Sequence, residues 1–519
     1  MTDPWAASTA RLQALQDRLA AAETADLSHS ELEDLIQGQG RELLRQLFQD
    51  RADLQTVREP RLPVVVGADG VQRTTVEVAH ARTLTTVFGD VQFQRLAYRH
   101  RGSANLHPAD ARLNLPEEHY SHGVRRLAAI EASQVSFAES VEGLREATHA
   151  PHTEVQKRQV EELAQRAAID FDAFYAQADR PTAADEAVLA LSLPRKSPSG
   201  SVPRGIFILI GGPPRAHGSF DGKGIAMRPE ALRPATAAAA AAAPPAARLV
   251  NGEQPHHKRM AEVAAVFDVQ PVPRTPDDIL GSTDQPRPAP TASGKWLTAS
   301  VVQDIRTVIA QAFTEAERRD PEHRRTWLAL VDGNNEQLRH ILAQARARHL
   351  NLVILLDFIH VLGYLWQAAH CFFPNDSPVA PTWVQEKALA ILAGQAALVA
   401  AAVRRKATRT GLAPPDRKGA DDCADYLLRK QRYLDYPTAL RCGWPIATGV
   451  IEGACRQLVK DRMDVTGARW GLDSAEAVLK LRALRTNRDF DRYWAYHLAA
   501  ERRRVHEQRY AHQVIPRPD

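Results

Sequence analysis

The chain has 519 residues, of which 44% are hydrophobic and 25% are charged, and its formal net charge is +4. This length exceeds what one hydrophobic core serves, so we expect about three domains. No apolar run approaches the roughly 20 residues of a membrane helix, and the N-terminal sequence lacks a signal-peptide core. We therefore expect a cytoplasmic protein with no membrane partner.

The spacing of the four cysteines and the excess of basic residues further limit the class of protein to which the chain can belong. The cysteines lack CxxC spacing, which argues against a disulfide framework and a zinc ribbon. The isoelectric point of about 8.8 is compatible with a nucleic-acid partner.

Residues 1–58 and 59–110 differ in pattern. In 1–58, leucines recur near helical spacing, which predicts an N-terminal helical region. In 59–110, short β-branched runs are separated by glycines, which predicts a β-rich region. The run VQFQRLAYRHR (91–101) places arginines beside aromatic residues. It fits a solvated strand edge or, alternatively, a ribbon facing DNA.

Residues 111–180 return to a helical pattern. Ser136 and Glu139 have the spacing of a capping box at a helix start. A short break then precedes a helix with Lys157 and Arg158 near its beginning. A helix, a turn and a second helix with early basic residues fit a helix-turn-helix DNA-binding domain. Three-helix packing without a DNA role is the alternative.

The middle of the chain mixes biased and ordered segments. Residues 181–204 are rich in Pro and Ser and predict a linker. The β-branched run 204–212 and EVAAVFDV (262–269) predict strands. Between them, residues 229–250 form an Ala/Pro-rich surface insertion. A helix is expected over 301–319.

Two short apolar runs that each end in an aspartate carry the strongest local signal. WLALV (327–331) precedes Asp332, and LVILL (352–356) precedes Asp357. Helices are expected after each, over 336–348 and 358–373. An Asp at the end of a buried parallel strand faces the crevice where α/β sheets present chemistry. Alternatively, each Asp only caps the helix that follows it.

Two further acids have a comparable context. Asp221 precedes the glycine turn Gly222-Lys223-Gly224, and Glu452 lies in the first turn of a helix behind a glycine-rich turn. Three carboxylates without His or Cys ligands would form an oxygen site suited to Mg²⁺. Two such ions, about 3.5–4 Å apart, activate a nucleophile and stabilise the leaving oxygen of a phosphodiester.

Five segments together resemble a known family. They are SFDGKGIAMRPEALR, KRMAEVAAVFDV, ALVDGNNEQL, LLDFIHVLGYLW and GVIEGACRQLVKDRMDVTGARW. In this order they resemble bacterial insertion-sequence transposases of the ISKra group, which are related to the Mutator-like DDE transposases. The similarity extends upstream through NLPEEHYSHGVRRLAA and covers most of residues 85–495.

The resemblance implies a fold class: an α/β RNase H-like catalytic core interrupted by an all-α insertion, behind a mixed helical and β N-terminal region with a helix-turn-helix. The implied parts are the first core segment 205–360, the helical insertion 361–445, the second core segment 446–495 with the Glu helix, and a basic tail 496–519.

The resemblance also implies the site. Asp221, Asp332 and Glu452 match the DDE triad, which would hold two Mg²⁺ or Mn²⁺ ions. Asp357 and His360 match the Asp-x-x-His signature and would brace the base of the helical insertion. Asp357 also ends a strand and is the alternative second ligand. A Cys-rich knuckle common in the family is absent from the sequence, so zinc is not predicted.

The implied function is metal-dependent cleavage of DNA at insertion-sequence ends and strand transfer, or DNA transposition. The partners would be terminal inverted repeats and target DNA, bound by a homodimer or larger assembly near the bacterial nucleoid. A metal-dependent nuclease without strand transfer and an inactive DNA-binding regulator are the alternatives. The candidate DNA contacts are Arg456, Lys460, Arg462, Arg469, Trp470, Lys157 and Arg158. A solvated basic helix and, for Trp470, core packing are the other interpretations.

Overall fold

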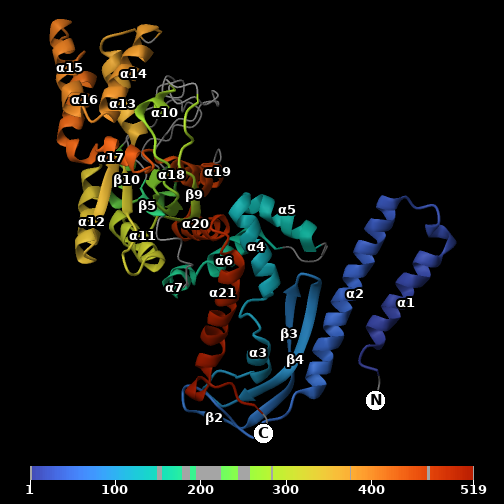
Figure 1. The fold of residues 1–519 in the computed structure, drawn as a ribbon. Helices are drawn as coiled ribbons and strands as arrows, with labels where there is room; N and C mark the ends of the chain where they lie inside the picture. The colour runs from blue at the N-terminus through green and yellow to red at the C-terminus, as the bar shows by residue number, and fades with distance from the viewer. Residues whose placement is uncertain are drawn as a thin grey trace. The chain divides into compact units, whose positions relative to one another are not determined.

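The computed structural model describes residues 3–148, 155–177, 187–193, 224–242, 258–281, 285–374, 376–464 and 468–517. The chain divides into two compact units (Figure 1). The first unit consists of Met1–Gln177 and Arg488–Asp519, and the second unit of Ala178–Asn487. Both ends of the chain therefore belong to the first unit.

In the first unit, a pair of helices lies beside a long two-stranded antiparallel sheet. Helix α1 (Ala6–Ala20) packs on α2 (His29–Arg58), and α2 packs on β4 (Gly89–Arg99), which pairs with β3 (Thr75–Thr86). Buried and exposed residues alternate along most of β4, as expected when one face of a sheet is covered. These elements match the helical and β-rich regions that the sequence predicts.

The other elements of the first unit are mostly short helices. They are η1 (Ala22–Thr24), β1 (Val65–Val66), β2 (Gln72–Arg73), α3 (Pro108–Leu113), α4 (His122–Gln134), α5 (Phe137–Thr148), α6 (Lys157–Ala167), α7 (Phe171–Gln177), α21 (Phe490–Val505), η5 (Glu507–Arg509) and η6 (Ala511–Gln513). The capping box at the start of α5 is confirmed. The Ser136 N–H donates to the Glu139 carboxylate over 2.9 Å, and the Glu139 N–H donates to the Ser136 hydroxyl over 3.1 Å.

The C-terminal segment differs from its prediction. Residues 496–519 were expected to form a basic tail after the core segment 446–495, but α21 belongs to the first unit and packs on α7. Its Tyr493 and His497 are buried, and the Tyr493 hydroxyl donates to the Ala167 carbonyl over 2.6 Å. Buried aromatic residues therefore anchor a helix that the sequence analysis had divided between a core segment and a basic tail.

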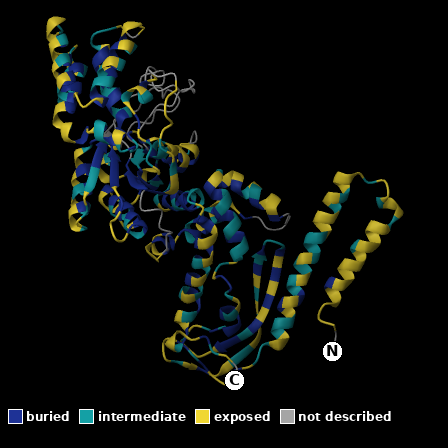
Figure 2. Ribbon diagram, in the orientation of Figure 1, coloured by how far each residue is buried: buried dark blue, intermediate teal, exposed yellow. Residues whose placement is uncertain are grey.

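The second unit is built on a five-stranded mixed sheet. Its order is β11-β10-β5-β8-β9, with β5 (Val188–Ser192), β8 (Glu262–Val269), β9 (Ala292–Ser300), β10 (Trp327–Val331) and β11 (Leu352–Leu356). Strands β5, β10 and β11 are parallel, whereas β5, β8 and β9 form an antiparallel series. Every residue of β5 and β10 is buried (Figure 2), which explains their continuous apolar sequences.

The strands predicted at 327–331, 352–356 and 262–269 are confirmed. The central strand β5 was missed, because the segment 181–204 was assigned to a linker. Four apolar residues and a serine, beside a Pro- and Ser-rich sequence, carry no periodicity that separates a strand from a loop. The strand predicted at 204–212 lies outside the described residues.

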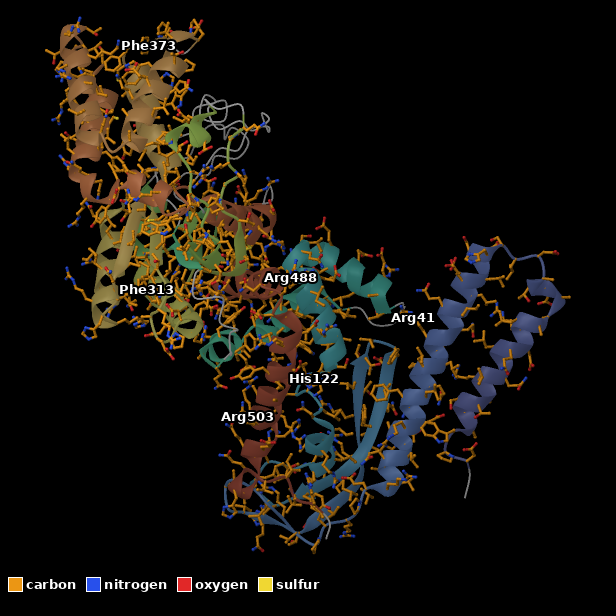
Figure 3. All side chains as sticks on the ribbon, viewed as in Figure 1. Arg41, His122, Phe313, Phe373, Arg488 and Arg503 are labelled. Carbon is orange, nitrogen blue, oxygen red and sulfur yellow. The ribbon has the colours of Figure 1, made fainter. Side chains whose placement is uncertain are left out.

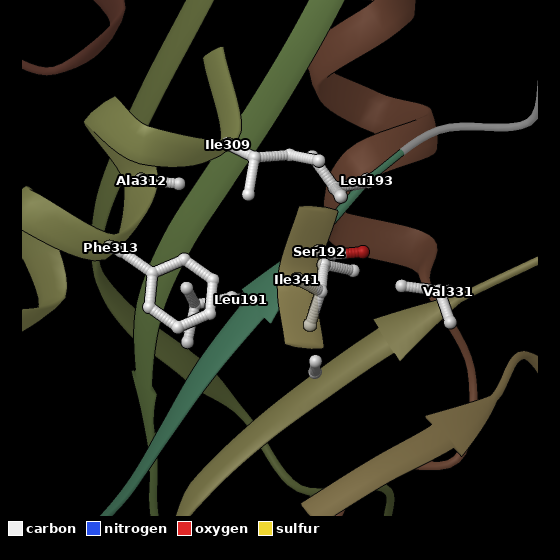
Figure 4. A pocket seen from close by; sticks show the side chains of 9 residues that line it. Leu191, Ser192, Leu193, Ile309, Ala312, Phe313, Val331 and Ile341 are labelled. Carbon is white, nitrogen blue, oxygen red and sulfur yellow. The ribbon is translucent and has the colours of Figure 1, made fainter. Parts of the chain in front are cut away.

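Helices α11 (Ile305–Arg319) and α12 (Asn335–Ala347) agree with the predicted helices; α11 packs on β8 and β5, and α12 packs on α11. Their side chains line a small apolar cavity with residues of β5 and β10 (Figure 4). Its lining residues are Leu191, Ser192, Leu193, Ile309, Ala312, Phe313, Ala329, Val331 and Ile341. Ser192 is the polar member, so this cavity is a packing gap rather than a polar binding site.

The region after β11 is helical, as predicted for 361–445. Its elements are α13 (Phe358–His370), α14 (Val379–Leu392), α15 (Ala396–Arg409), α16 (Lys418–Arg429), η3 (Gln431–Tyr433) and α17 (Tyr436–Arg441). Phe373 lies at the end of this insertion away from the sheet, whereas Phe313 lies beside the sheet (Figure 3). The ammonium group of Lys406 lies 4.7 Å from the centre of the Phe373 ring.

The remaining elements complete the second unit. They are β6 (Gly224–Ala226), η2 (Pro229–Ala231), α9 (Pro234–Ala242), β7 (Lys258–Met260), α10 (Pro276–Leu280), α18 (Gly449–Ala454), the π-helical turn η4 (Cys455–Lys460), α19 (Asp461–Met463) and α20 (Leu472–Thr486). Helix α9 lies within the predicted Ala/Pro-rich insertion 229–250. Within the described part of the chain, no helix combines the length and apolar character that a membrane span requires.

Candidate active site

The ends of β10 and β11 bring Asp332 and Asp357 to one edge of the sheet. The two strands are parallel and in register, with Val331 opposite Leu356. The Asp357 N–H donates to the Val331 carbonyl over 2.8 Å, so the strands stay paired up to the two aspartates. Carboxyl ends of parallel strands are where open α/β sheets bind ligands.

Asp332 is not the N-cap of the helix that follows it. Its carboxylate accepts a 2.8 Å hydrogen bond from the Asn334 N–H, but the N-cap of α12 is Asn334 itself. The Asn334 side chain accepts from the N–H groups of Glu336 and Gln337. The capping interpretation therefore does not account for the choice of an aspartate at position 332.

Asp357, in contrast, is the N-cap of α13. Its carboxylate accepts from the Ile359 N–H over 3.0 Å and from the Thr448 hydroxyl over 2.5 Å. Burial raises the pKa of Asp357 to about 6, a shift that the hydrogen bonds from Thr448 and Ile359 oppose and the nearby charge of Asp332 reinforces. The capping interpretation thus holds for one of the two aspartates.

The contacts of Thr448 join the helix that carries Glu452 to this region. Thr448 directly precedes α18, and Glu452 lies in the first turn of that helix. The hydrogen bond from Thr448 to Asp357 joins the start of α18 to the end of β11. The Phe358 N–H also donates to the Ile446 carbonyl over 2.8 Å. Glu452 is half-buried, and α18 packs on β8.

The third predicted ligand, Asp221, lies outside the described residues. No group of three or more His, Cys, Asp or Glu side chains that could hold a metal ion occurs within the described ranges, which do not include Asp221. The two described members of the predicted triad, Asp332 and Glu452, are carboxylates. They suit Mg²⁺ or Mn²⁺ in chemical type.

His360 belongs to an aromatic group beside these carboxylates. Its ring lies edge-on to Tyr364 and Tyr426, with centroid separations of 5.2 and 5.4 Å. Tyr364 stacks on Tyr426, with centroids 4.1 Å apart and ring planes 18° apart. The two residues of the predicted Asp-x-x-His pair therefore have different partners: Asp357 contacts Thr448, and His360 contacts the helical insertion.

Residues of α16 and its C-terminal end were missed by the sequence analysis. The Tyr426 hydroxyl donates to the Asp332 carbonyl over 3.0 Å, and the Lys430 ammonium donates to the Asn335 side chain over 2.5 Å. The spacing of Tyr426 and Lys430, four residues apart on a helix, is the one available sequence signal. This spacing is common in helices, and by itself it does not predict that the two residues lie at the site, which depends on the packing of α16 on α13.

The predicted DNA-contacting residues after Glu452 differ in the solvent exposure of their side chains. Arg456, Lys460 and Arg469 are exposed, and Arg456 lies 3.5 Å from the Asp461 carboxylate. Arg456 and Lys460 lie in the π-helical turn, a feature frequent at functional sites. A π turn contains more residues than an α turn, so these two positions stay near the face that Glu452 occupies.

The prediction that Trp470 and Arg462 contact DNA is corrected by the structure, because both side chains are buried. The Arg462 guanidinium lies 4.6 Å from the centre of the Trp470 ring, and the indole N–H donates to the Met463 carbonyl over 3.2 Å. Trp470 also exchanges backbone hydrogen bonds with Ala226 and Arg228. The core-packing interpretation of Trp470 therefore replaces base stacking.

In the first unit, Lys157 and Arg158 are exposed at the start of α6. Arg158 pairs with Glu162 over 2.9 Å on the same helix. Residues 149–154, which contain the predicted turn of the helix-turn-helix, lie outside the described residues. The DNA-binding role of this segment stays a prediction.

Two comparisons with known proteins complete the description of the site. No protein-family model matches the chain. A search of the curated proteins likewise found no match for it.

Proposed function

We propose that the protein is a DDE-type transposase that cleaves DNA at insertion-sequence ends and joins the freed 3′ end to target DNA. One observation carries this proposal. The hydrogen bond between Thr448 and Asp357 ties the start of the Glu452 helix to the strand end beside Asp332. Two predicted triad carboxylates, 120 residues apart in the sequence, thereby derive from segments that meet at one sheet edge.

The topology of the second unit supports an RNase H-like core. Strand β5 has an antiparallel series, β8 and β9, on one side and the parallel strands β10 and β11 on the other. The helical region from α13 to α17 lies in sequence between Asp332 and Glu452, as the proposed insertion requires. Asp221 would contribute the third carboxylate.

In this proposal each residue has a distinct task. Asp332 and Glu452, with Asp221, would hold Mg²⁺ or Mn²⁺, which supplies charge stabilisation for phosphodiester hydrolysis and strand transfer. Asp357 would act as a positioning residue, because its carboxylate caps α13 and holds Thr448. Exposed Arg456 and Lys460 would contact DNA phosphates near Glu452.

The proposed partners are the terminal inverted repeats and target DNA, bound by a homodimer or larger synaptic assembly in the bacterial cytoplasm. The first unit would recognise the repeats through α5 and α6. A nuclease without strand transfer, or an inactive DNA-binding regulator, would share DNA binding. Assays of DNA cleavage and strand joining distinguish these three functions.

The test uses the full chain and DNA duplexes that carry the terminal repeats flanking its coding sequence, with Mg²⁺ or Mn²⁺. We expect nicking and joining, and loss of both in Asp332→Asn and Glu452→Gln. Asp473→Asn, at an exposed position on α20, is the matched control and should retain activity.

Cleavage that survives Glu452→Gln would overturn the triad. Nicking without joining would favour the nuclease, and binding without cleavage the regulator. If Asp357→Asn abolishes cleavage while Asp332→Asn does not, the ranking of the two aspartates is wrong.

A further inference from the structure

Two side chains of α13 and two from the C-terminal end of α16 lie in the region of Asp332. His360 and Tyr364 are four residues apart on α13, and Tyr426 and Lys430 are four residues apart at the C-terminal end of α16. Residues with this spacing share a helix face. Because α13 and α16 pack on each other, the rings of His360, Tyr364 and Tyr426 form one cluster, and Lys430 follows Tyr426 by one helical turn.

The close approach of the two helices depends on a glycine. A Cβ atom at Gly419, near the start of α16, would lie 2.6 Å from the Gln367 carbonyl oxygen of α13. The backbones of the two helices therefore approach each other closely at this end. At the other end this spacing allows Tyr364 and Tyr426 to stack at 4.1 Å.

The rings differ in burial and so in what they can contact. Tyr426 is buried, and its hydroxyl is engaged by the Asp332 carbonyl. Tyr364 and His360 are half-buried, with one face of Tyr364 covered by Tyr426. The exposed part of this pair is an aromatic surface supported from behind, which suits a second flat ring.

Lys430 places a positive charge beside the 332–335 loop, which Tyr426 also contacts. It is half-buried and bonded to Asn335, three residues after Asp332. An ammonium group has three donor hydrogens, so one bond to Asn335 leaves donors for another acceptor. A supported aromatic surface next to a cation is the combination with which proteins hold single-stranded nucleic acid.

We propose that Tyr364, His360 and Lys430 form a subsite for one unstacked nucleotide of the DNA strand. The base would stack on Tyr364 and His360, and its phosphate would contact Lys430. This inference rests on the proposed function for the identity of the ligand as DNA. It gives the helical insertion a task beyond spacing, since it holds a nucleotide next to the strand-end carboxylates.

The probe is a Y-shaped DNA duplex with 2-aminopurine in its single-stranded 3′ arm, mixed with the full chain in Ca²⁺ so that no cleavage is needed. We expect binding to change the 2-aminopurine fluorescence. Tyr364→Leu should abolish this change and weaken binding of the probe about 5- to 150-fold, the range for loss of one base stack. Tyr364→Phe, which retains the ring, should behave as the original protein.

Lys430→Gln should lower the slope of log affinity against log salt by about 0.7, the value for one single-strand phosphate contact. Tyr496→Leu, a half-buried tyrosine in the first unit, is the control for loss of a ring elsewhere. Circular dichroism of each variant identifies misfolding, and for a misfolded Tyr364→Leu the Tyr364→Phe and Lys430→Gln variants carry the test.

An unchanged fluorescence response in Tyr364→Leu, or an unchanged salt slope in Lys430→Gln, would overturn the subsite and leave the cluster as a brace between α13 and α16. Absence of any binding of the probe would also overturn it. Failure of the proposed function has a different signature, because it removes cleavage and joining with Mg²⁺ while the fluorescence response in Ca²⁺ remains.

Discussion

The Thr448 hydroxyl donates a 2.5 Å hydrogen bond to the buried carboxylate of Asp357. This bond joins two segments 91 residues apart, and Thr448 directly precedes the helix with Glu452. Thr448→Val keeps the shape of the side chain but removes this donor. Because a hydrogen bond to a charged group contributes about 1.5–3 kcal/mol, we expect a loss of that order in the free energy of unfolding.

Cleavage by Thr448→Val should fall at least about tenfold, since a small displacement of a catalytic group has large effects on rate. Thr448→Ser retains the hydroxyl and is the matched control. Urea unfolding and the nicking assay measure the two effects. Equal behaviour of the Val and Ser variants in both would contradict a positioning role for this bond.

The raised pKa of Asp357 predicts a pH-dependent effect of Asp357→Asn. With a pKa of about 6 in the folded state and 3.8 as the ordinary value, the folded protein binds more protons between these limits. The contribution of this group to stability is therefore greatest at low pH and falls as pH rises from about 4 to 6.

The substitution Asp357→Asn removes the fall in stability with rising pH, and an asparagine can still cap α13. In the presence of EDTA we expect the variant to gain up to about 3 kcal/mol relative to the original protein between pH 4 and pH 8. Thermal unfolding across this range measures the difference. A constant difference at all pH values would contradict the prediction.

The Ser192 hydroxyl on the central strand is buried and has no hydrogen-bond partner among the described residues. Removing it should relieve an unpaired polar group, so we expect Ser192→Ala to raise the free energy of unfolding by about 1 kcal/mol. Ser300→Ala on β9 is the opposite control. Its hydroxyl donates to Glu476 over 2.8 Å and accepts from the Gln303 N–H, so that variant should be destabilised.

The packing of α13 on α16 predicts opposite effects for two glycine substitutions. Gly419→Ala would place a Cβ atom 2.6 Å from the Gln367 carbonyl oxygen, and the helices would have to separate. We expect a loss of about 1–3 kcal/mol from this overpacking. Gly363→Ala, on α13, meets no atom within 4 Å and should gain about 1 kcal/mol from helix propensity. Melting temperatures of the two variants make the comparison.

The first unit contains a buried ion network around α21. Arg125 is fully buried and bonds to Glu501 over 3.0 Å and to the Nε2 atom of His497 over 3.0 Å. The Nδ1 atom of His497 lies 2.7 Å from the Asp170 carboxylate. Burial alone would raise the pKa of Glu501, but Arg125, Arg504 and Arg166 outweigh it and lower the pKa to about 2.

Glu501→Gln leaves the buried charge of Arg125 less compensated, so we expect a loss of about 3–5 kcal/mol at pH 7. Because the folded pKa lies below the ordinary value of 4.5, the ionised group stabilises above that value, and this stabilisation is lost as pH falls toward 2. The difference between the proteins should therefore shrink from pH 4.5 downward in urea unfolding. Glu142→Gln, at an exposed pair with Arg145, is the control and should be near neutral.

The sequence indicated most local elements of the second unit. The apolar runs before Asp332 and Asp357 are strands at the predicted residues, and the helices after them begin within one residue of prediction. Local pattern was sufficient there because length, apolar content and an abrupt polar end agree. It failed at β5, whose five residues became a central strand only through pairing with β8 and β10.

By itself, the sequence determined that two strands end in aspartates, that Glu452 opens a helix, and that basic residues follow it. Only the tertiary structure distinguished the aspartates, because one carboxylate caps a helix and contacts Thr448 while the other does not cap. It also buried Trp470 and Arg462 and brought Tyr426 and Lys430 beside Asp332. Spacing along a chain fixes neighbours on one element, whereas burial and contacts between elements depend on how the faces of distant segments pack.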